Sequence, residues 1–360
     1  MRVARFRRYM NEQQMSESRI TTVNCIGLGH WGPNLIRAIA ANPHARVHTV
    51  CDIDESRLKL IRRNIPSIEK SSDDPGATID DPAADAVVIA TPTRTHFELA
   101  KRALNAGKHV LVEKPLALDV REAEELADLA DSRGLVLAVG HVFLFNKGVL
   151  AIRDLIRSGE LGGINYIFST RTNLGPVRTD CNALWDLASH DLSIIDFWLD
   201  AHPVSVTARG QSFLNPPIED VVIANFTYPF DIMACVHASW LNPSKIREIT
   251  VVGQKKMAIF DDMNLDAPVR IFSKSIDAPR ESDYVDSYDS FLMNIVQHGD
   301  VLIPHLTGGE PVANQVNHFI DCILTGKTPV NSGRFATEIV RELAAAETSM
   351  KNRSILTPIE

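Results

Sequence analysis

The stretch Val23-Asn24-Cys25-Ile26-Gly27-Leu28-Gly29-His30-Trp31-Gly32 joins a short apolar run to the pattern G-x-G-x-x-G. The apolar run predicts a strand, and the segment after Gly32 has helical character. Gly27 permits a tight turn, Gly29 lets a pyrophosphate approach the backbone, and Gly32 lets the helix pack close to the strand. The N-terminus of that helix would offer N–H groups to the phosphates. The stretch therefore predicts a dinucleotide-binding site.

An acidic residue at the end of the next apolar run refines this prediction. Asp52 lies twenty residues beyond Gly32. Its carboxylate can accept hydrogen bonds from a ribose diol, and its charge would repel a 2′-phosphate. We therefore expect NAD as the cofactor, with NADP less favoured. A glycine turn without a ligand is the alternative, and the strand, helix and acid at the right spacing argue against it.

Strand-like and helix-like segments alternate from residue 21 to residue 145, which predicts a right-handed, doubly wound parallel sheet. Ligands of such sheets bind beyond the carboxyl ends of the strands. The glycine turn, Asp52 and the residues after two further apolar runs, 85–90 and 109–112, all fall at those ends. The predicted cofactor-binding residues are Gly27, Gly29, His30, Trp31, Gly32, Asp52, Thr91, Pro92, Thr93, His96, Glu113 and Lys114. We interpret His96 and His141 as structural residues by default. His96 is nevertheless kept among the candidates for cofactor binding.

The pattern of apolar and polar residues changes at Ile164. Short strand-like runs linked by turns follow, interrupted by one helix at 184–199 and followed by helices at 310–324 and 332–350. This pattern predicts an α+β domain with a large open, mostly antiparallel sheet. We expect a flexible tail at 1–20, a nucleotide-binding domain at 21–145, and a substrate-binding and oligomerisation domain at 146–360, whose C-terminal helices could pack back on the nucleotide-binding domain. The alternative for the tail is an ordered arm in an oligomer.

Composition restricts the class of protein. The formal net charge is −8, which gives no support to binding of nucleic acid or of an anionic membrane. No apolar run is long enough to cross a bilayer. The 5 cysteines are scattered without a C-x-x-C pair. We therefore expect a reducing, cytoplasmic location and no metal held by cysteine.

Three residues form the predicted catalytic group. Lys114 follows a buried strand, where its ammonium group could bind a substrate hydroxyl and stabilise a developing alkoxide. Asp186 and His190 have the i,i+4 spacing that places two side chains on one helix face. The carboxylate would orient the imidazole, which accepts the proton of an alcohol. A surface lysine and an unrelated acid and histidine are the alternatives. No third ligand at a telling spacing indicates a metal, so none is predicted.

The glycine pattern, Glu113-Lys114-Pro115 and Asp186…His190 occur in an order and spacing that resembles the glucose–fructose oxidoreductase/inositol dehydrogenase/MocA (GFO/IDH/MocA) family, over about residues 20–355. The resemblance implies an N-terminal Rossmann domain and a C-terminal domain with a large open sheet. It implies hydride transfer between NAD(P) and a sugar or cyclitol carbon, in a homodimer or homotetramer formed through that sheet. It also implies Lys114, Asp186 and His190 as the catalytic group in a cleft between the domains, and a cis bond before Pro115.

The segment from Arg171 to Asp186 resembles, more narrowly, bacterial nucleotide-sugar 3-dehydrogenases that oxidise C3 of UDP-N-acetylglucosaminuronate. Arginines suit carboxylate or phosphate groups, and asparagines suit hydroxyl or amide groups. Each of these residues could instead make structural hydrogen bonds. The predicted substrate-binding residues are Lys114, Arg171, Asn173, Arg178, Asn182 and His190.

Other functions remain open from the sequence. Within enzymes, the alternatives are a free sugar or inositol dehydrogenase and a ketoreductase that runs in the reverse direction. A catalytically silent NAD-binding regulator is the alternative from another class, although such a protein would be expected to lose Lys114 or His190. Either of these two residues could be the general base.

Overall fold

The computed structural model describes residues 20–179, 181–276, 296–297 and 299–360, so all but the last residue of the predicted tail 1–20 lies outside the described residues. The chain divides into two compact units. The first comprises Met1–Phe145 and Gly309–Val340, and the second comprises Asn146–Gly308 and Arg341–Glu360. A segment near the C-terminus therefore completes the first unit.

The first unit contains a six-stranded parallel sheet in the order β3-β2-β1-β4-β5-β6. All six residues of β1 and all four of β4 are buried, as expected for strands covered on both faces. The sheet confirms the predicted doubly wound architecture. Its strands are β1 (Thr21–Ile26), β2 (Ala45–Cys51), β3 (Lys70–Ser72), β4 (Ala86–Ile89), β5 (His109–Val112) and β6 (Leu137–Val139).

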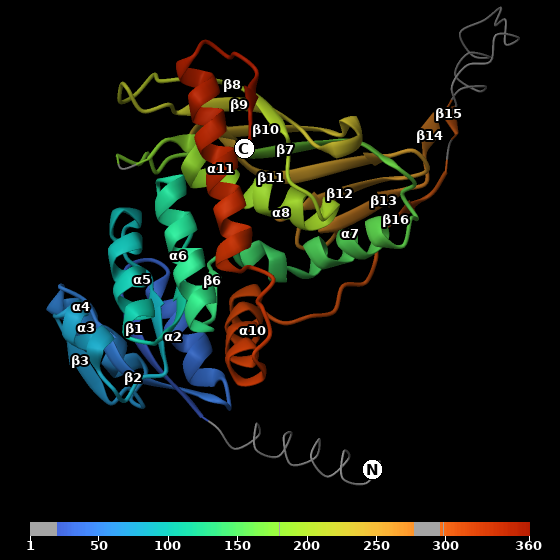
Figure 1. Ribbon diagram of the computed structural model, residues 1–360. Coiled ribbons are helices and arrows are strands. Elements are labelled where there is room, and N and C mark those ends of the chain that lie inside the picture. The colour runs from blue at the N-terminus through green and yellow to red at the C-terminus, as the bar shows by residue number, and fades with distance from the viewer. Residues whose placement is uncertain (1–19, 180, 277–295, 298) are drawn as a thin grey trace, which may run out of the picture. The chain divides into compact units, whose positions relative to one another are not determined.

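Helices connect and cover these strands (Figure 1). Local sequence sets their ends: α6 begins after Asp119, which accepts hydrogen bonds from two N–H groups of the first turn, and ends at Gly134 in the left-handed conformation. Late in the chain, α10 packs against α2 and contributes Val316, Phe319 and Ile320 to the core. The helices are α2 (Gly32–Ala41), α3 (Glu55–Asn64), α4 (Pro75–Asp80), α5 (His96–Asn105), α6 (Val120–Arg133) and α10 (Pro311–Thr325), with 3₁₀ turns η1 (Thr93–Thr95) and η2 (Val142–Phe145).

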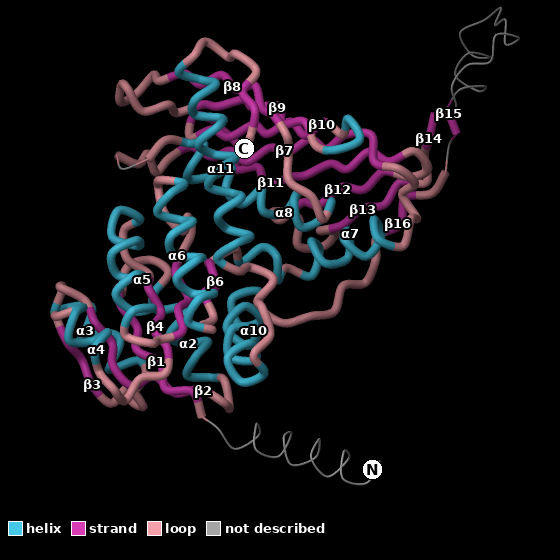
Figure 2. The backbone as a smooth tube through the Cα atoms, viewed as in Figure 1, coloured by secondary structure: helices cyan, strands magenta, loops and turns pink. Residues whose placement is uncertain are grey.

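The second unit contains a nine-stranded sheet in the order β16-β13-β12-β11-β7-β10-β9-β8-β17. Every pair is antiparallel except β7 with β10, which confirms the predicted mostly antiparallel sheet. Figure 2 shows the strands of this sheet in magenta. Its strands are β7 (Ile164–Leu174), β8 (Ser205–Gln211), β9 (Val221–Thr227), β10 (Met233–Ser239), β11 (Leu241–Gly253), β12 (Met257–Asp261), β13 (Val269–Phe272), β16 (Val301–Leu302) and β17 (Thr357–Pro358). A separate pair is formed by β14 (Ser275–Ile276) and β15 (Val296–Gln297).

The two faces of this large sheet differ. Helices α7 (Lys147–Arg157) and α8 (Ser189–Leu199) pack against one face, where Ile167 and Val236 are buried. Neighbouring residues on β7, Tyr166 and Phe168, point the other way and are exposed by 41% and 44%. The second face therefore presents apolar side chains.

A wide helical turn precedes α8. The sequence predicted one α-helix at 184–199, whereas Leu184–Ala188 form a π-helical turn (η3) before α8 begins. The last long helix is α11 (Gly333–Lys351), and a 3₁₀ turn η4 (Pro229–Asp231) joins β9 to β10. Within the described ranges, no helix combines the length and apolar character needed to cross a membrane.

Candidate cofactor and catalytic site

The three glycines of the turn have different surroundings. Gly27 has φ of +94°, and a Cβ there would collide with the carbonyl oxygen of Ala90. A Cβ on Gly32 would collide with the carbonyl oxygen of Gly27. A Cβ on Gly29 would meet only the Arg57 guanidinium, 4.0 Å away. Packing thus requires the first and third glycines, whereas the second borders open space.

Asp52 holds the glycine turn in place. Its Oδ2 accepts a hydrogen bond from the Leu28 N–H at 2.6 Å, and its Oδ1 accepts one from the Asp54 N–H at 2.9 Å. Arg57, in the first turn of α3, lies 3.7 Å from Asp52 Oδ2. Our sequence reasoning missed this arginine, although its position just after the acid could have indicated it. Its charge would favour the 2′-phosphate of NADP, whereas Asp52 would repel that group.

The start of α2 has the features of a phosphate site. The helix follows Trp31 without a side-chain cap, and a proline occupies its first turn. Trp31 is 38% exposed, and its ring meets that of His30 edge to face, with centroids 5.8 Å apart. The glycine turn, the uncapped helix start and the carboxylate of Asp52 together fit a dinucleotide.

His96 connects two strand ends. Its Nδ1 lies 2.8 Å from the carbonyl oxygen of Pro115, and its Nε2 lies 3.0 Å from that of Thr91. The ring is buried, so it fixes the segment after β4 to the segment after β5. The predicted cis peptide bond between Lys114 and Pro115 is present. Of the other candidates here, Pro92 is exposed and Thr93 is buried.

Lys114 stands beside two unusual ionisable groups. Burial raises the pKa of Glu113 to about 7, and the Lys114 charge opposes this rise. Burial and the Lys114 charge lower the pKa of His141 to about 3. The Glu113 carboxylate fills the space where a side chain on Gly140 would lie. A neutral imidazole therefore lies near the lysine at the carboxyl edge of the sheet. The sequence placed His141 at a strand end but did not predict this association.

Asp186, in the second unit, is held by two side chains. Arg178 Nη1 donates to Asp186 Oδ1 at 3.2 Å, and Trp240 Nε1 donates to Oδ2 at 3.1 Å. The residue lies in the π-helical turn, whose hydrogen bonds close over five residues rather than four. The prediction placed Asp186 and His190 on one face of a single α-helix. In the structure only His190 belongs to an α-helix, in the first turn of α8, so the α-helical i,i+4 relation does not describe this pair.

The other predicted substrate residues make contacts within the fold. Arg171 and Asp191 form a buried ion pair, with Nε at 3.0 Å from both carboxylate oxygens and Nη2 at 2.9 Å from Oδ1. Asn182 donates to Glu219 Oε2 at 2.9 Å and accepts from the Trp185 N–H at 3.2 Å. A further contact joins Asn173 Nδ2 to the carbonyl oxygen of Gly175.

The N-terminal and C-terminal parts of the chain match models of the same oxidoreductase family. Residues 21–141 match the oxidoreductase family with an NAD-binding Rossmann fold, and residues 149–259 match the GFO/IDH/MocA C-terminal domain. The scyllo-inositol 2-dehydrogenase (NAD(+)) of Bacillus subtilis is 27% identical over 354 residues, which cover 91% of this chain and 93% of that protein.

Two further proteins are similar to this chain, one over part of its sequence and one in its fold. The UDP-N-acetylglucosamine 3-dehydrogenase of Acidithiobacillus ferrooxidans is 34% identical over 181 residues, or 50% of this chain and 56% of that protein. The crystal structure of an oxidoreductase domain protein from Kribbella flavida has a TM-score of 0.80 at 21% identity, and the match covers 95% of this chain and 100% of the other. The fold and the two family matches confirm the predicted resemblance: the chain belongs to the GFO/IDH/MocA family of oxidoreductases.

Proposed function

We propose that the protein is an NAD-dependent dehydrogenase of a sugar secondary alcohol, with C3 of a nucleotide-linked sugar such as UDP-N-acetylglucosaminuronate as the first candidate. The observation that carries this proposal is the position of Lys114. It follows β5 at the same sheet edge as the glycine turn and Asp52. A cation at that edge is suited to an alcohol oxygen next to a bound nicotinamide.

NAD is the proposed cofactor, held by Gly29, the start of α2 and Asp52. When bound, NAD supplies the acceptor for the hydride that leaves the alcohol carbon. The negative charge of Asp52 supports NAD, and the neighbouring Arg57 makes NADP the alternative. The ratio of kcat/KM values for the two cofactors distinguishes them.

In the proposed reaction, Lys114 binds the substrate oxygen and His190 accepts its proton. His141 is neutral and adds no positive charge to the site, so the Lys114 ammonium group is the cation that would stabilise a developing alkoxide. Asp186, fixed by Arg178 and Trp240, would orient the imidazole of His190. The two roles could be exchanged between Lys114 and His190.

Substrate recognition is proposed to centre on Arg178 rather than Arg171. The Arg178 side chain is 34% exposed and pairs with Asp186 through Nη1, whereas the Arg171 side chain is 4% exposed and pairs with Asp191. A partly exposed guanidinium can bind a carboxylate or phosphate with two parallel hydrogen bonds. Arg178→Lys should therefore raise KM for anionic sugars more than for neutral ones.

The catalytic roles are tested with His190→Ala and Lys114→Ala. Each should lower turnover by roughly 10²–10⁴-fold, with little change in NAD affinity, because a positioned acid–base group contributes about that factor. His305→Ala and Lys59→Ala, which alter exposed residues, are the matched controls. Wild-type turnover in His190→Ala and Lys114→Ala would refute the scheme.

The substrate class is tested with a panel of UDP-sugars, free sugars and inositols, followed by the absorbance of reduced nicotinamide. A free inositol or sugar dehydrogenase is the second candidate, because the inositol dehydrogenase similarity extends over 91% of the chain. The corresponding ketones test the reverse direction. Preference for an inositol over every UDP-sugar would replace the first candidate by the second.

We also propose that two or four copies associate through the open face of the large sheet. Its apolar side chains support this, and they include Tyr166, Phe168, Ile223 and Met233. Phe168→Glu should shift the protein to monomers in light scattering coupled to size exclusion, whereas a wild-type monomer would contradict the proposal. All five cysteines are free thiols, which supports the proposed cytoplasmic location.

A further inference from the structure

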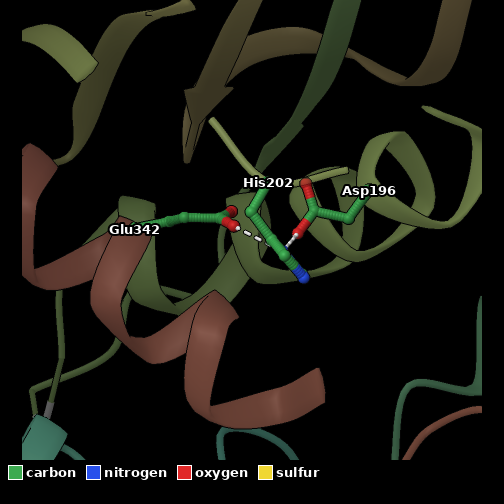
Figure 3. Close-up of side chains that lie close together, drawn as sticks. All are labelled: Asp196, His202 and Glu342. Carbon is green, nitrogen blue, oxygen red and sulfur yellow. Dashed lines mark hydrogen bonds and ion pairs between the residues drawn. The ribbon is translucent and has the colours of Figure 1, made fainter. Parts of the chain in front are cut away.

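Three side chains of the second unit converge at a point that the proposed reaction does not use. Asp196 comes from α8, His202 from the segment after it, and Glu342 from α11 (Figure 3). His202 Nδ1 lies 2.6 Å from Asp196 Oδ2 and 3.5 Å from Glu342 Oε1. One oxygen or nitrogen from each residue lies within 4.8 Å of the other two.

Glu342 is the unusual member of this cluster. Its side chain is 0% exposed, and neither carboxylate oxygen accepts a hydrogen bond from any residue that the structure describes. Figure 3 shows the carboxylate directed at the imidazole of His202. A buried carboxylate without hydrogen bonds is costly, because water no longer solvates its charge. The side chain therefore has unused ligand capacity directed into the cluster.

The charges around Glu342 make a cation favourable. The Asp196 side chain is also 0% exposed, and no lysine or arginine pairs with either carboxylate in the described ranges. Two buried carboxylates therefore face a single imidazole, an arrangement whose negative charge a divalent cation could neutralise.

We propose that this cluster is a binding site for a divalent transition-metal ion, with Zn²⁺ as the first candidate. The ligands would be Asp196 Oδ2, His202 Nδ1 and Glu342 Oε1. Histidine nitrogen and carboxylate oxygen are ordinary zinc ligands, and such bonds are about 2.0–2.2 Å long. A tetrahedral site with these bonds separates its ligands by about 3.3 Å. The distances of 2.6 and 3.5 Å from His202 Nδ1 bracket that separation.

The surroundings also fit a metal site. Tyr228 donates its hydroxyl proton to Asp196 Oδ1 at 2.7 Å, which leaves Oδ2 directed at His202. Outer hydrogen bonds of this kind orient a metal-binding carboxylate. The His202 side chain is 42% exposed, so water can complete the coordination. A bound ion would tie α8 and the following segment to α11 within the second unit.

Zinc binding is tested on the full-length protein after removal of metals by a chelator. Isothermal titration with ZnCl₂ should show one ion per chain, and Glu342→Gln and Asp196→Asn should each weaken its affinity at least about tenfold. Tyr228→Phe should weaken it by about 10-fold, as expected for the loss of an outer partner. Asp200→Asn is the matched control, because Asp200 lies between Asp196 and His202 in the sequence and its side chain is 80% exposed.

X-ray absorption of the wild-type zinc complex gives a test that does not depend on a variant folding. The proposal expects nitrogen and oxygen ligands at about 2.0–2.2 Å and no sulfur at about 2.3 Å. No zinc binding would overturn it, and the triad would then be a buried ion cluster charged by protonated His202 alone. Sulfur ligands would assign the zinc to cysteines, and unchanged affinity in a folded Glu342→Gln would show that Glu342 is not a ligand; either result would overturn the proposal.

Discussion

Alanine substitutions at two glycines of the turn should separate folding from cofactor binding. Gly27→Ala places a side chain against the Ala90 carbonyl at a φ of +94°. Gly29→Ala places the same methyl group where its nearest neighbour is Arg57 Nη1 at 4.0 Å. We therefore expect Gly27→Ala to reduce stability and Gly29→Ala to reduce NAD affinity.

The magnitudes follow from these surroundings. The left-handed conformation costs an L-residue about 1–2 kcal/mol, and overpacking adds about 1–3 kcal/mol. Gly27→Ala should therefore lower the free energy of unfolding by about 2–5 kcal/mol, or Tm by at least about 4 °C. Gly29→Ala should change it by less than about 0.5 kcal/mol. Losing charge-assisted hydrogen bonds to the pyrophosphate, at about 1.5–3 kcal/mol, should weaken NAD binding about 10- to 150-fold.

Thermal melting without cofactor and NAD titration by calorimetry measure the two effects separately. The partly exposed Trp31, which precedes α2, offers a fluorescence signal for the same titration. Gly29→Ala with the melting temperature of the wild type and clearly weaker NAD binding is the expected result. Wild-type NAD affinity in Gly29→Ala would refute the assignment of the phosphate site to this turn.

Three further outcomes follow from individual contacts. Arg57→Ala should lower kcat/KM with NADP more than with NAD, and an equal loss with both cofactors would contradict the 2′-phosphate role. Arg171→Met should destabilise the protein by about 3–5 kcal/mol in denaturant unfolding, since it leaves the buried Asp191 carboxylate unpaired, and Arg171→Met with Asp191→Leu should recover part of that loss. Burial favours the protonated form of Glu113, so its pKa is about 7 in the folded protein and 4.5 in the unfolded chain. The resulting contribution to the free energy of unfolding is fully present below pH 4.5 and is lost as the pH rises through about 7. Melting between pH 5 and pH 8 should therefore show wild-type Tm falling relative to Glu113→Gln, and parallel curves would contradict this assignment.

The parallel sheet was predictable because its signals are local. Continuous apolar runs indicate strands buried on both faces, and Gly27 and Gly32 occupy positions where the backbone leaves no room for a side chain. The change to an antiparallel sheet was also predictable from short runs separated by turns. That a C-terminal helix could pack back on the first unit was also expected, but the amphipathic pattern of α10 did not show which surface of that unit its apolar face would cover.

The candidate site was predictable only where its residues follow strands. The edge that carries Lys114 followed from the order of strands, whereas the neutral state of His141 depends on burial that the sequence does not reveal. The π-helical turn at Asp186 was also not predicted, because a single wide turn does not change the spacing of apolar residues enough to be recognised in the sequence. Arg171 looked like an anion-binding residue until its side chain was found paired with Asp191.

The hydrogen bond from the Leu28 N–H to Asp52 gives one carboxylate two tasks. The group expected to select the cofactor also secures the loop that carries it, so selectivity and loop geometry cannot vary independently at this position. An attempt to redesign the protein for NADP by replacing Asp52 would disturb the turn at the same time. Strengthening the positive charge around Arg57 changes the selectivity while leaving the hydrogen bonds that brace the turn intact.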